Sequence, residues 1–174
     1  MISSSEDKNS DYLKNGQVDL LASNQINTSH FENEIMPTAP IHQDAIEIVV
    51  TRKGSKLNNL DELSGKTIAV RERSHGLETL ENYNHKLKSK KLAPIKIEVL
   101  DENISTQYIL EIVNSGLLPE ALTRKYFAQV WSGVYKDLVL NSNFPLSQHQ
   151  SVHWLVNKKS VVLLKHLNTF INRT

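Results

Sequence analysis

The amino-acid sequence predicts an α/β fold with a mainly parallel sheet. Short apolar or β-branched runs alternate along the chain with segments of helical periodicity, which is the order expected of strands joined by crossover helices. The chain has 174 residues, which is enough for one ordinary domain or for two small lobes with a hydrophobic core. No internal repeat or low-complexity tract interrupts this order.

Six runs are predicted to be strands, because each is short, apolar or β-branched, and bounded by glycine or polar residues. They cover residues 18–23, 45–53, 67–72, 95–100, 137–141 and 151–158. Between the first two runs, residues 24–40 are rich in Asn, Thr, Ser and Pro. That composition is typical of a loop.

Four segments are predicted to be helices. The first covers residues 76–91, and one of its faces carries residues at helical spacing: Leu77, Leu80, Asn84 and Leu87. The second begins after Ser105, a predicted N-cap, and ends at Gly116. The third covers residues 124–132. The last follows Ser160, and its inward face is expected to hold Leu163, Leu164, Leu167, Phe170 and Ile171.

Composition excludes several classes of function. Lys and Arg number 20 against 19 Asp and Glu, giving a net charge of +1; this balance argues against a nucleic-acid groove or a polybasic membrane anchor. The absence of cysteine excludes disulfides, thiolate catalysis and Cys-ligated metals. No apolar run approaches the roughly 20 residues of a membrane span. The opening stretch, "MISSSEDKNSDYLKNG", lacks the apolar core of a secretory signal.

Catalytic motifs are also missing. The sequence contains no G-x-S-x-G, no H-E-x-x-H and no P-loop. His149 and His153 share a strand face but have no third candidate ligand, so no metal site is expected. The chain is therefore predicted not to be an enzyme and to need no cofactor.

Several stretches together resemble a known family. "GQVDLLASNQINTSHF", a proline near position 40, and "IEIVVTRKGSKLNNLDELSGKTIAVRERSHGLETLENYNHKL" resemble the family-3 extracellular solute-binding domain, which has the type II periplasmic-binding-protein fold. "ILEIVNSGLLPEAL" and "VHWLVNKKSVVLLKHLNTFI" look more like the binding-protein-like module of membrane-bound lytic transglycosylase F. The resemblance covers about residues 10–172.

The resemblance implies two lobes joined by two hinge strands, with a small molecule clamped between the lobes. Strands 45–53 and 151–158 are expected to run side by side as the hinge. Residues 1–47 and 147–174 then form part of the first lobe, and residues 48–146 form the hinge and the second lobe. The strand and helix that usually open the first lobe have no counterpart here, so a truncated first lobe and self-association through its uncovered apolar face are expected.

The resemblance also implies a set of ligand contacts. In amino-acid binders of the family, a Thr and, three residues later, an Arg hold the ligand carboxylate; here Thr28 matches the Thr, and Phe31 takes the place of the Arg. An acidic residue on a later helix holds the ligand ammonium, and Arg124 aligns with that position. Two of the usual pairing residues are therefore replaced. An ordinary free amino acid is a doubtful ligand for that reason.

The remaining implied contacts surround the start of the helix that begins near residue 76. Ser74 matches the family's Ser, and the His75 and Gly76 amides lie beside it, where the positive end of a helix attracts an anion. Arg71 and Arg73 would add positive charge. Structural roles stay open at this stage: Ser74 can be a helix cap, Phe31 a packing residue, and the two arginines solvated.

The sequence thus predicts a non-enzymatic solute-binding domain for a small anionic, amino-acid-like or muropeptide-like ligand, located in the periplasm or outside the cell. Its biological setting would be solute transport or cell-wall turnover. Two alternatives remain. One is a ligand-free interaction or sensory module with a vestigial cleft. The other is a piece of a lytic transglycosylase without its catalytic domain.

Overall fold

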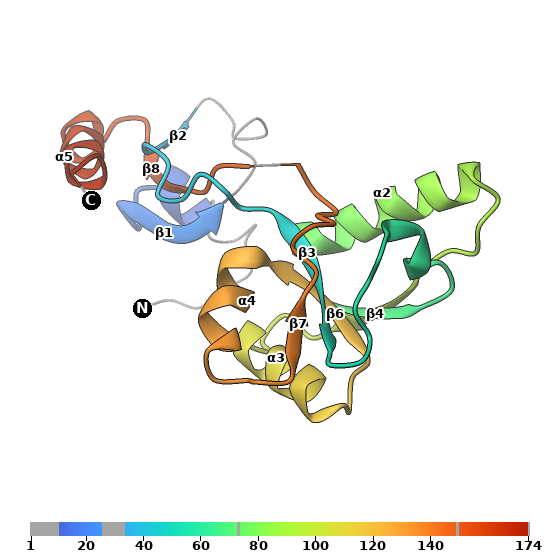
Figure 1. The fold of residues 1–174 in the computed structure, drawn as a ribbon. Helices are drawn as coiled ribbons and strands as arrows, with labels where there is room; N and C mark the ends of the chain where they lie inside the picture. Colours follow the sequence, from blue (N-terminus) through green and yellow to red (C-terminus); the bar gives the residue numbers. More distant parts are fainter. Residues whose placement is uncertain (1–10, 26–33, 73, 149, 174) are drawn as a thin grey trace. The chain divides into compact units, whose positions relative to one another are not determined.

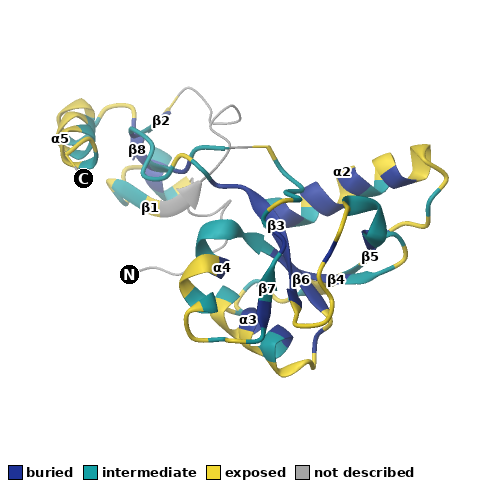
Figure 2. Cartoon of the chain, viewed as in Figure 1, coloured by how far each residue is buried: buried dark blue, intermediate teal, exposed yellow. Residues whose placement is uncertain are grey.

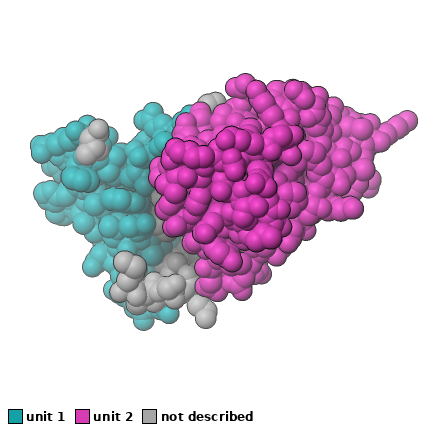
Figure 3. Space-filling view, turned by 60° about the horizontal axis from the view of Figure 1, so that its bottom comes forward, with its two compact units in different colours: residues 1–45, 149–174 teal, residues 46–148 magenta. Residues whose placement is uncertain are grey.

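The computed structural model describes residues 11–25, 34–72, 74–148 and 150–173. The chain forms two compact units, which are coloured separately in Figure 3. Unit 1 consists of residues 1–45 and 149–174, and unit 2 of residues 46–148. Unit 1 is therefore built from the two ends of the chain, and unit 2 from its middle (Figure 1).

Unit 2 contains a five-stranded sheet in the order β5-β4-β6-β3-β7. Its strands are β3 (Glu47–Arg52), β4 (Thr67–Arg71), β5 (Lys96–Leu100), β6 (Glu120–Arg124) and β7 (Leu138–Leu140). β4 pairs in parallel with β5 and β6, whereas β3 pairs antiparallel with β6 and β7. The expectation of a mainly parallel sheet is wrong. The connection from β3 to β4 contains one short 3-10 helix, η1 (Leu60–Leu63), instead of a crossover helix, so β4 starts at the edge where β3 ends.

Helices α2 (His75–Ser89), α3 (Thr106–Ser115) and α4 (Lys125–Ser132) complete unit 2. The predicted boundaries of α3 are confirmed: the Ser105 hydroxyl accepts a hydrogen bond from the Tyr108 N–H at 3.2 Å, and Gly116 ends the helix at φ 83°. α2 buries Leu80 and Leu87, as its periodicity predicted. The central strands of the sheet are buried on both faces, which Figure 2 shows as dark blue along β3 and β4, whereas β5 is partly exposed.

Two apolar clusters cover these two faces. Ile48 and Val50 of β3 pack in one cluster with residues of α3, while Val49 packs in the other with Leu80 and Leu87 of α2. Successive side chains of a strand point to opposite faces, so a strand covered on both sides is apolar without interruption. This is why the run that forms β3 could be predicted from its sequence.

The structure contains a central strand that the sequence did not predict, β6. Its sequence, "EALTR", has no β-branched run and ranks poorly as a strand by composition. Ala121 is fully buried and lies opposite both Val50 of β3 and Ala69 of β4. Its strand conformation is therefore imposed by the two neighbouring strands.

Unit 1 contains an antiparallel sheet in the order β1-β8-β2 and the helix α5 (Val161–Ile171). The strands are β1 (Leu20–Gln25), β2 (Ile35–Pro37) and β8 (His153–Asn157). β2 lies in the stretch expected to be a loop, and this expectation is wrong because Ile35–Pro37 pairs with β8. The buried core of this unit centres on Leu13, Ile35 and Leu155.

The prediction that α5 packs inward is confirmed only in part: Leu163, Leu164, Leu167 and Ile171 are half-buried, whereas Phe170 is exposed. None of its 11 residues is buried, and Phe170 is 59% exposed. The side chain of Ser160 makes no capping hydrogen bond. The Ala39 N–H donates to Asn168 Oδ1 at 2.6 Å, which ties the helix to the rest of unit 1. A sheet of three short strands offers too little apolar surface to cover a whole helix face.

The two expected hinge segments, 45–53 and 151–158, meet only where they begin: β3 and β8 belong to different sheets, but the Ala45 N–H donates to Gln150 O at 3.0 Å. The segments that precede them do pair. Within unit 1, the Ile41 N–H donates to Val152 O and the Val152 N–H to His42 O, both at 2.8 Å. Within unit 2, the Leu146 N–H donates to Glu47 O at 2.8 Å. The pairing of the two expected hinge segments is therefore limited to their first residues and does not extend along β3 and β8.

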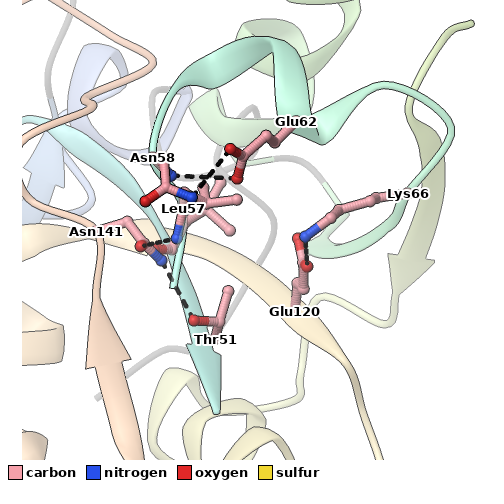
Figure 4. Close-up of polar contacts among 8 residues, drawn as sticks. Thr51, Leu57, Asn58, Glu62, Lys66, Glu120 and Asn141 are labelled. Atoms are coloured by element: carbon pink, nitrogen blue, oxygen red, sulfur yellow. Dashed lines mark hydrogen bonds and ion pairs between the residues drawn. The ribbon is translucent and has the colours of Figure 1, made fainter. Parts of the chain in front are cut away.

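A buried asparagine secures the turn after β3 (Figure 4). Asn141 is 4% exposed; its Oδ1 accepts from the Leu57 N–H at 2.9 Å, and its Nδ2 donates to Val49 O at 3.0 Å. Its Nδ2 also lies 3.3 Å from Thr51 Oγ1. Buried polar groups without partners destabilise the folded state. Because Asn141 supplies these partners, its side chain holds together β3, the end of β7 and the turn around residue 57.

Replacing Asn141 by Leu should lower the free energy of unfolding by about 1–3 kcal/mol, because the Leu57 N–H would be buried without an acceptor. Urea unfolding followed by circular dichroism measures the change. Asn58→Ala is the matched control: Asn58 is exposed and bonds the half-buried Glu62 at the surface, so its loss should cost less than about 0.5 kcal/mol. Equal losses in the two variants would contradict the role given to Asn141.

Candidate functional site

Several polar residues lie at one edge of the sheet of unit 2. Arg71 and Arg124 end the parallel strands β4 and β6. Glu47 begins β3 and lies directly opposite Arg124 in the strand register. α2 begins at the end of β4, with Ser74 as its N-cap residue. We call this the carboxyl edge; in open α/β sheets, ligands bind outside the carboxyl ends of the strands.

A buried carboxylate forms the base of this edge. Glu47 is 3% exposed, and its Oε2 accepts a hydrogen bond from Thr79 Oγ1 at 2.5 Å. The same oxygen lies 3.2 Å from His75 Nδ1, which is also 3.2 Å from Thr79 Oγ1. Because an ionised carboxylate can only accept hydrogen bonds, the proton between Glu47 and His75 belongs to Nδ1. The contact therefore fixes which ring nitrogen carries a proton.

This arrangement changes the titration of His75. Its hydrogen bond to Glu47 raises the pKa of His75 above the ordinary value of 6.5, and the charges of Glu47 and Glu78 act in the same direction. Burial and the charge of Arg124 oppose the increase in pKa. The side chain of His75 is 23% exposed, so it is neither sealed in the core nor fully solvated. His75 can thus carry a positive charge near neutral pH at the carboxyl edge.

Close packing explains the glycine in the first turn of α2. A Cβ added to Gly76 would lie 3.0 Å from Val70 Cγ2, 3.2 Å from Leu122 Cδ2 and 3.3 Å from Glu47 Oε1. Larger residues would push α2 away from β4 and β6. The first turn of the helix is therefore held against the strand ends and next to the buried carboxylate.

Ser74 occupies the N-cap position, but its side chain does not cap the helix. Its hydroxyl donates to Arg71 O at 2.6 Å instead of accepting from the first turn. The interpretation of Ser74 as a capping hydroxyl is therefore wrong. The side chain is turned back towards the end of β4, which stabilises the elbow between strand and helix.

Arg124 also has a defined environment. Its Nη1 lies 3.2 Å from the Tyr126 hydroxyl oxygen, to which it donates. Arg124 is the N-cap residue of α4 and is half-buried. A guanidinium held in this way can form two parallel hydrogen bonds with a carboxylate, which a lysine cannot.

Four of the seven predicted ligand contacts lie at the carboxyl edge: Arg71, Ser74, His75 and Arg124. Thr28, Phe31 and Arg73 lie outside the described residues. Sequence reasoning missed Glu47 and Thr79. A signal for both was present, because Glu47 is the lone acidic residue in the apolar run "AIEIVV", and Thr79 follows His75 by four residues on the same helix face.

Among the described residues, no three His, Asp or Glu side chains are grouped so that they could hold a metal ion. Within the same described part of the chain, no helix is both long enough and apolar enough to cross a bilayer. What this edge offers chemically is positive charge from two arginines and a histidine, together with the amino end of a 15-residue helix.

The Glu47–His75 contact makes stability depend on pH. A histidine whose pKa is raised by folding stabilises the native state fully below about pH 6.5 and loses that contribution as pH rises through the raised pKa. The unfolding free energy of the wild type relative to His75→Asn should therefore decrease between pH 6 and pH 9. His85→Asn, an exposed histidine on the same helix, should show no such trend. Denaturant unfolding at several pH values measures both differences.

Comparison with solved structures gives similar proteins of one fold. One similar structure comes from work on glutathione import in Gram-positive bacteria via GshT and the cystine ABC importer TcyBC of Streptococcus mutans. It has 14% sequence identity and a TM-score of 0.76, and the match covers 97% of this chain and 68% of that protein's chain. The substrate-binding protein of an amino acid ABC transporter has 18% identity and a TM-score of 0.73, over 98% of this chain and 71% of its own. A solute receptor for L-cysteine of Neisseria gonorrhoeae has 15% identity and a TM-score of 0.71, over 99% and 65%.

No protein-family model matches the chain, and no curated protein matches it either. The link to lytic transglycosylase F therefore stays a prediction. The chain spans between 65% and 71% of the length of the three solved proteins. These likenesses show that the chain has the α/β fold of the type II periplasmic binding proteins, as its sequence predicted.

Proposed function

We propose that this chain is a non-enzymatic solute-binding domain whose carboxyl edge holds a small anionic, amino-acid-like ligand. The observation that carries the proposal is the fold, which it shares at a TM-score of 0.76 with a protein studied in glutathione and cystine import. Two further proteins of this fold are an amino acid transporter's substrate-binding protein and an L-cysteine receptor. Fold alone does not define a function, so the site must support it.

The charge at the carboxyl edge favours an anion. Arg71 and Arg124 end adjacent parallel strands, and His75 adds a third cationic group when it is protonated. Glu47 is buried and its Oε2 is engaged by His75 and Thr79, while Glu78 lies in the first turn of α2. The edge therefore suits carboxylates better than a ligand ammonium group. We expect a dicarboxylate or an acidic peptide-like molecule to bind more tightly than a neutral amino acid.

Finer assignments rest on the sequence resemblance. They are the contacts of Thr28, Phe31 and Arg73 with the ligand, a location in the periplasm or outside the cell, and a muropeptide ligand in the setting of a lytic transglycosylase. A muropeptide carries both peptide and carboxylate groups, so it belongs to the ligand class that the charge of the edge favours.

A ligand screen by thermal shift tests the proposal directly. The panel should contain neutral and acidic amino acids, dicarboxylates, cystine, glutathione and muropeptides. A ligand present at 100 times its Kd should add about 2.7 kcal/mol to the free energy of unfolding. Acidic compounds should give the largest shifts. If no compound of the panel raises the melting temperature, the result contradicts the proposal and favours the alternative hypothesis of a ligand-free module with a vestigial cleft.

Loss of the Arg124 charge should weaken binding of the best anionic ligand by about 10- to 100-fold, since hydrogen bonds to charged groups contribute roughly 1.5–3 kcal/mol. Titration calorimetry of Arg124→Gln measures the change. Arg52→Gln is the matched control, because Arg52 lies at the opposite end of β3, is half-exposed and faces Asp137. Equal weakening in the two variants would show a general effect of net charge and would count against the site.

We also propose that unit 1 associates with a second copy of the chain through α5. Val161, Val162 and Phe170 are 62%, 71% and 59% exposed on this helix, which buries none of its residues. Val162 and Phe170 lie about 80° apart around the helix axis, and exposed apolar side chains on one side of a helix commonly mark association surfaces.

Sedimentation velocity should show dimers that dissociate in Val162→Glu but persist in Val134→Glu, an equally apolar and exposed position of unit 2. The added carboxylate in α5 would have to be buried without a partner at the interface. A wild-type protein that stays monomeric at high concentration would refute the association.

A further inference from the structure

We infer that Glu47 is a positioning residue that makes anion capture at the carboxyl edge depend on pH, by holding His75 in the orientation and tautomer in which its protonation supplies charge to the site. This inference rests on the proposed function, because it concerns the same edge and the same class of ligand. It adds pH regulation to the proposed site, and it gives roles to Glu47 and Thr79, which are not among the predicted ligand contacts.

The geometry around the carboxylate supports this role. Glu47 is 3% exposed, and Oε2 receives the Thr79 hydroxyl at 2.5 Å and contacts His75 Nδ1 at 3.2 Å. The Thr79 hydroxyl proton is directed to Glu47, so its oxygen is available to His75 Nδ1, 3.2 Å away. The side chains of Glu47, His75 and Thr79 thus each contact the other two. The imidazole ring cannot rotate without breaking two contacts.

These contacts determine which nitrogen of the imidazole ring gains or loses a proton. Nδ1 carries a proton in both charge states, so the proton that His75 gains or loses is the one on Nε2. The two nitrogens lie on different sides of the ring, which places Nε2 on the side away from the carboxylate. With 23% of its side chain exposed, His75 can exchange this proton with solvent.

Charged groups from three elements face His75. Glu47 comes from β3, Glu78 from α2 itself and Arg124 from β6. The two carboxylates favour the imidazolium, while Arg124 disfavours it, and the balance raises the pKa of His75 above 6.5. As pH rises through the raised pKa of His75, the charge beside Arg124 therefore falls by one unit.

An anion at this edge responds to that change. When His75 is protonated, its charge offsets that of Glu47, and the positive charge of the arginines is left to attract the ligand. When His75 is neutral, Glu47 repels the ligand. By linkage, an anion that binds more tightly to the protonated form must also raise the pKa of His75 when it binds. A shift of one pKa unit on binding corresponds to a tenfold change in affinity.

Sulfate is the appropriate probe, because it stays a dianion throughout the tested range and its own charge does not change. Its Kd should be measured by calorimetry or NMR titration on the full chain between pH 5.5 and pH 8.5. The wild type is expected to lose about tenfold in affinity, with a midpoint at the His75 pKa. The NMR signals of the imidazole give that pKa independently, with and without sulfate.

Three variants separate the roles. His75→Asn should abolish the pH dependence, Glu47→Gln should move the midpoint to lower pH together with the NMR-measured pKa, and His85→Asn should leave both unchanged. His85 is exposed on the same helix and provides the matched loss of a histidine. If Glu47→Gln does not fold, Thr79→Val tests the same contacts, since it removes the second contact to His75 and the donor to Glu47.

The outcomes distinguish this inference from the proposed function. Sulfate binding whose pH dependence is the same in the wild type and in His75→Asn overturns the inference but leaves the binding site. An adventitious ion only, bound equally well by Arg124→Gln, overturns it too. If neither sulfate nor any compound of the ligand panel binds at any pH, the proposed function and the inference both fail.

Discussion

The structure of unit 2 depends on one buried carboxylate. Glu47 interrupts an apolar strand at the point where that strand enters the sheet, and a charge removed from water in this way requires hydrogen-bond partners. The partners come from α2, in the form of His75 and Thr79, one turn apart. The glycine between them lets the helix approach closely enough to reach the carboxylate. Because the buried Glu47 carboxylate requires hydrogen-bond partners from α2, the start of α2 lies over the ends of β4 and β6.

The two edges of this sheet use charge differently. At the amino ends of the parallel strands, Lys66 pairs with the buried Glu120 at 2.6 Å, and Figure 4 shows the two side chains pointing toward each other. That pair joins the start of β4 to the start of β6; Glu120 Oε1 accepts from the Lys66 ammonium, while Glu120 Oε2 is buried without a hydrogen-bond partner among the described residues. At the carboxyl ends the strands finish in arginines, Arg71 and Arg124, and the carboxylate lies beneath the helix start. Two arginines therefore lie at the edge where this class of sheet binds ligands.

Unit 1 has a much smaller hydrophobic core than unit 2. It has three short strands, a small buried core and a helix whose apolar residues are half-buried or exposed. Burial of apolar area provides most of the stability of a small domain, so a unit of this kind gains little from α5. Its strand β8 is nevertheless well fixed, because Asn157 Nδ2 donates to Leu13 O at 2.9 Å and the Thr38 hydroxyl accepts from the Trp154 N–H at 3.2 Å.

The sequence by itself determined the elements whose signals are local. The periodicity of α2, the Ser105 and Gly116 ends of α3 and the apolar run of β3 depend on neighbouring residues, and the fold class followed from their order. Tertiary structure alone decided the rest. β6 is a strand because Ala121 fits between two others, and β2 is one because β8 offers an edge. The Glu47–His75–Thr79 contact joins residues 28 and 32 positions apart in the chain, and no local pattern specifies which buried carboxylate will meet which helix. Whether an apolar helix face is fully buried, as in α2, or only half-buried, as in α5, depends on how much sheet the rest of the unit provides.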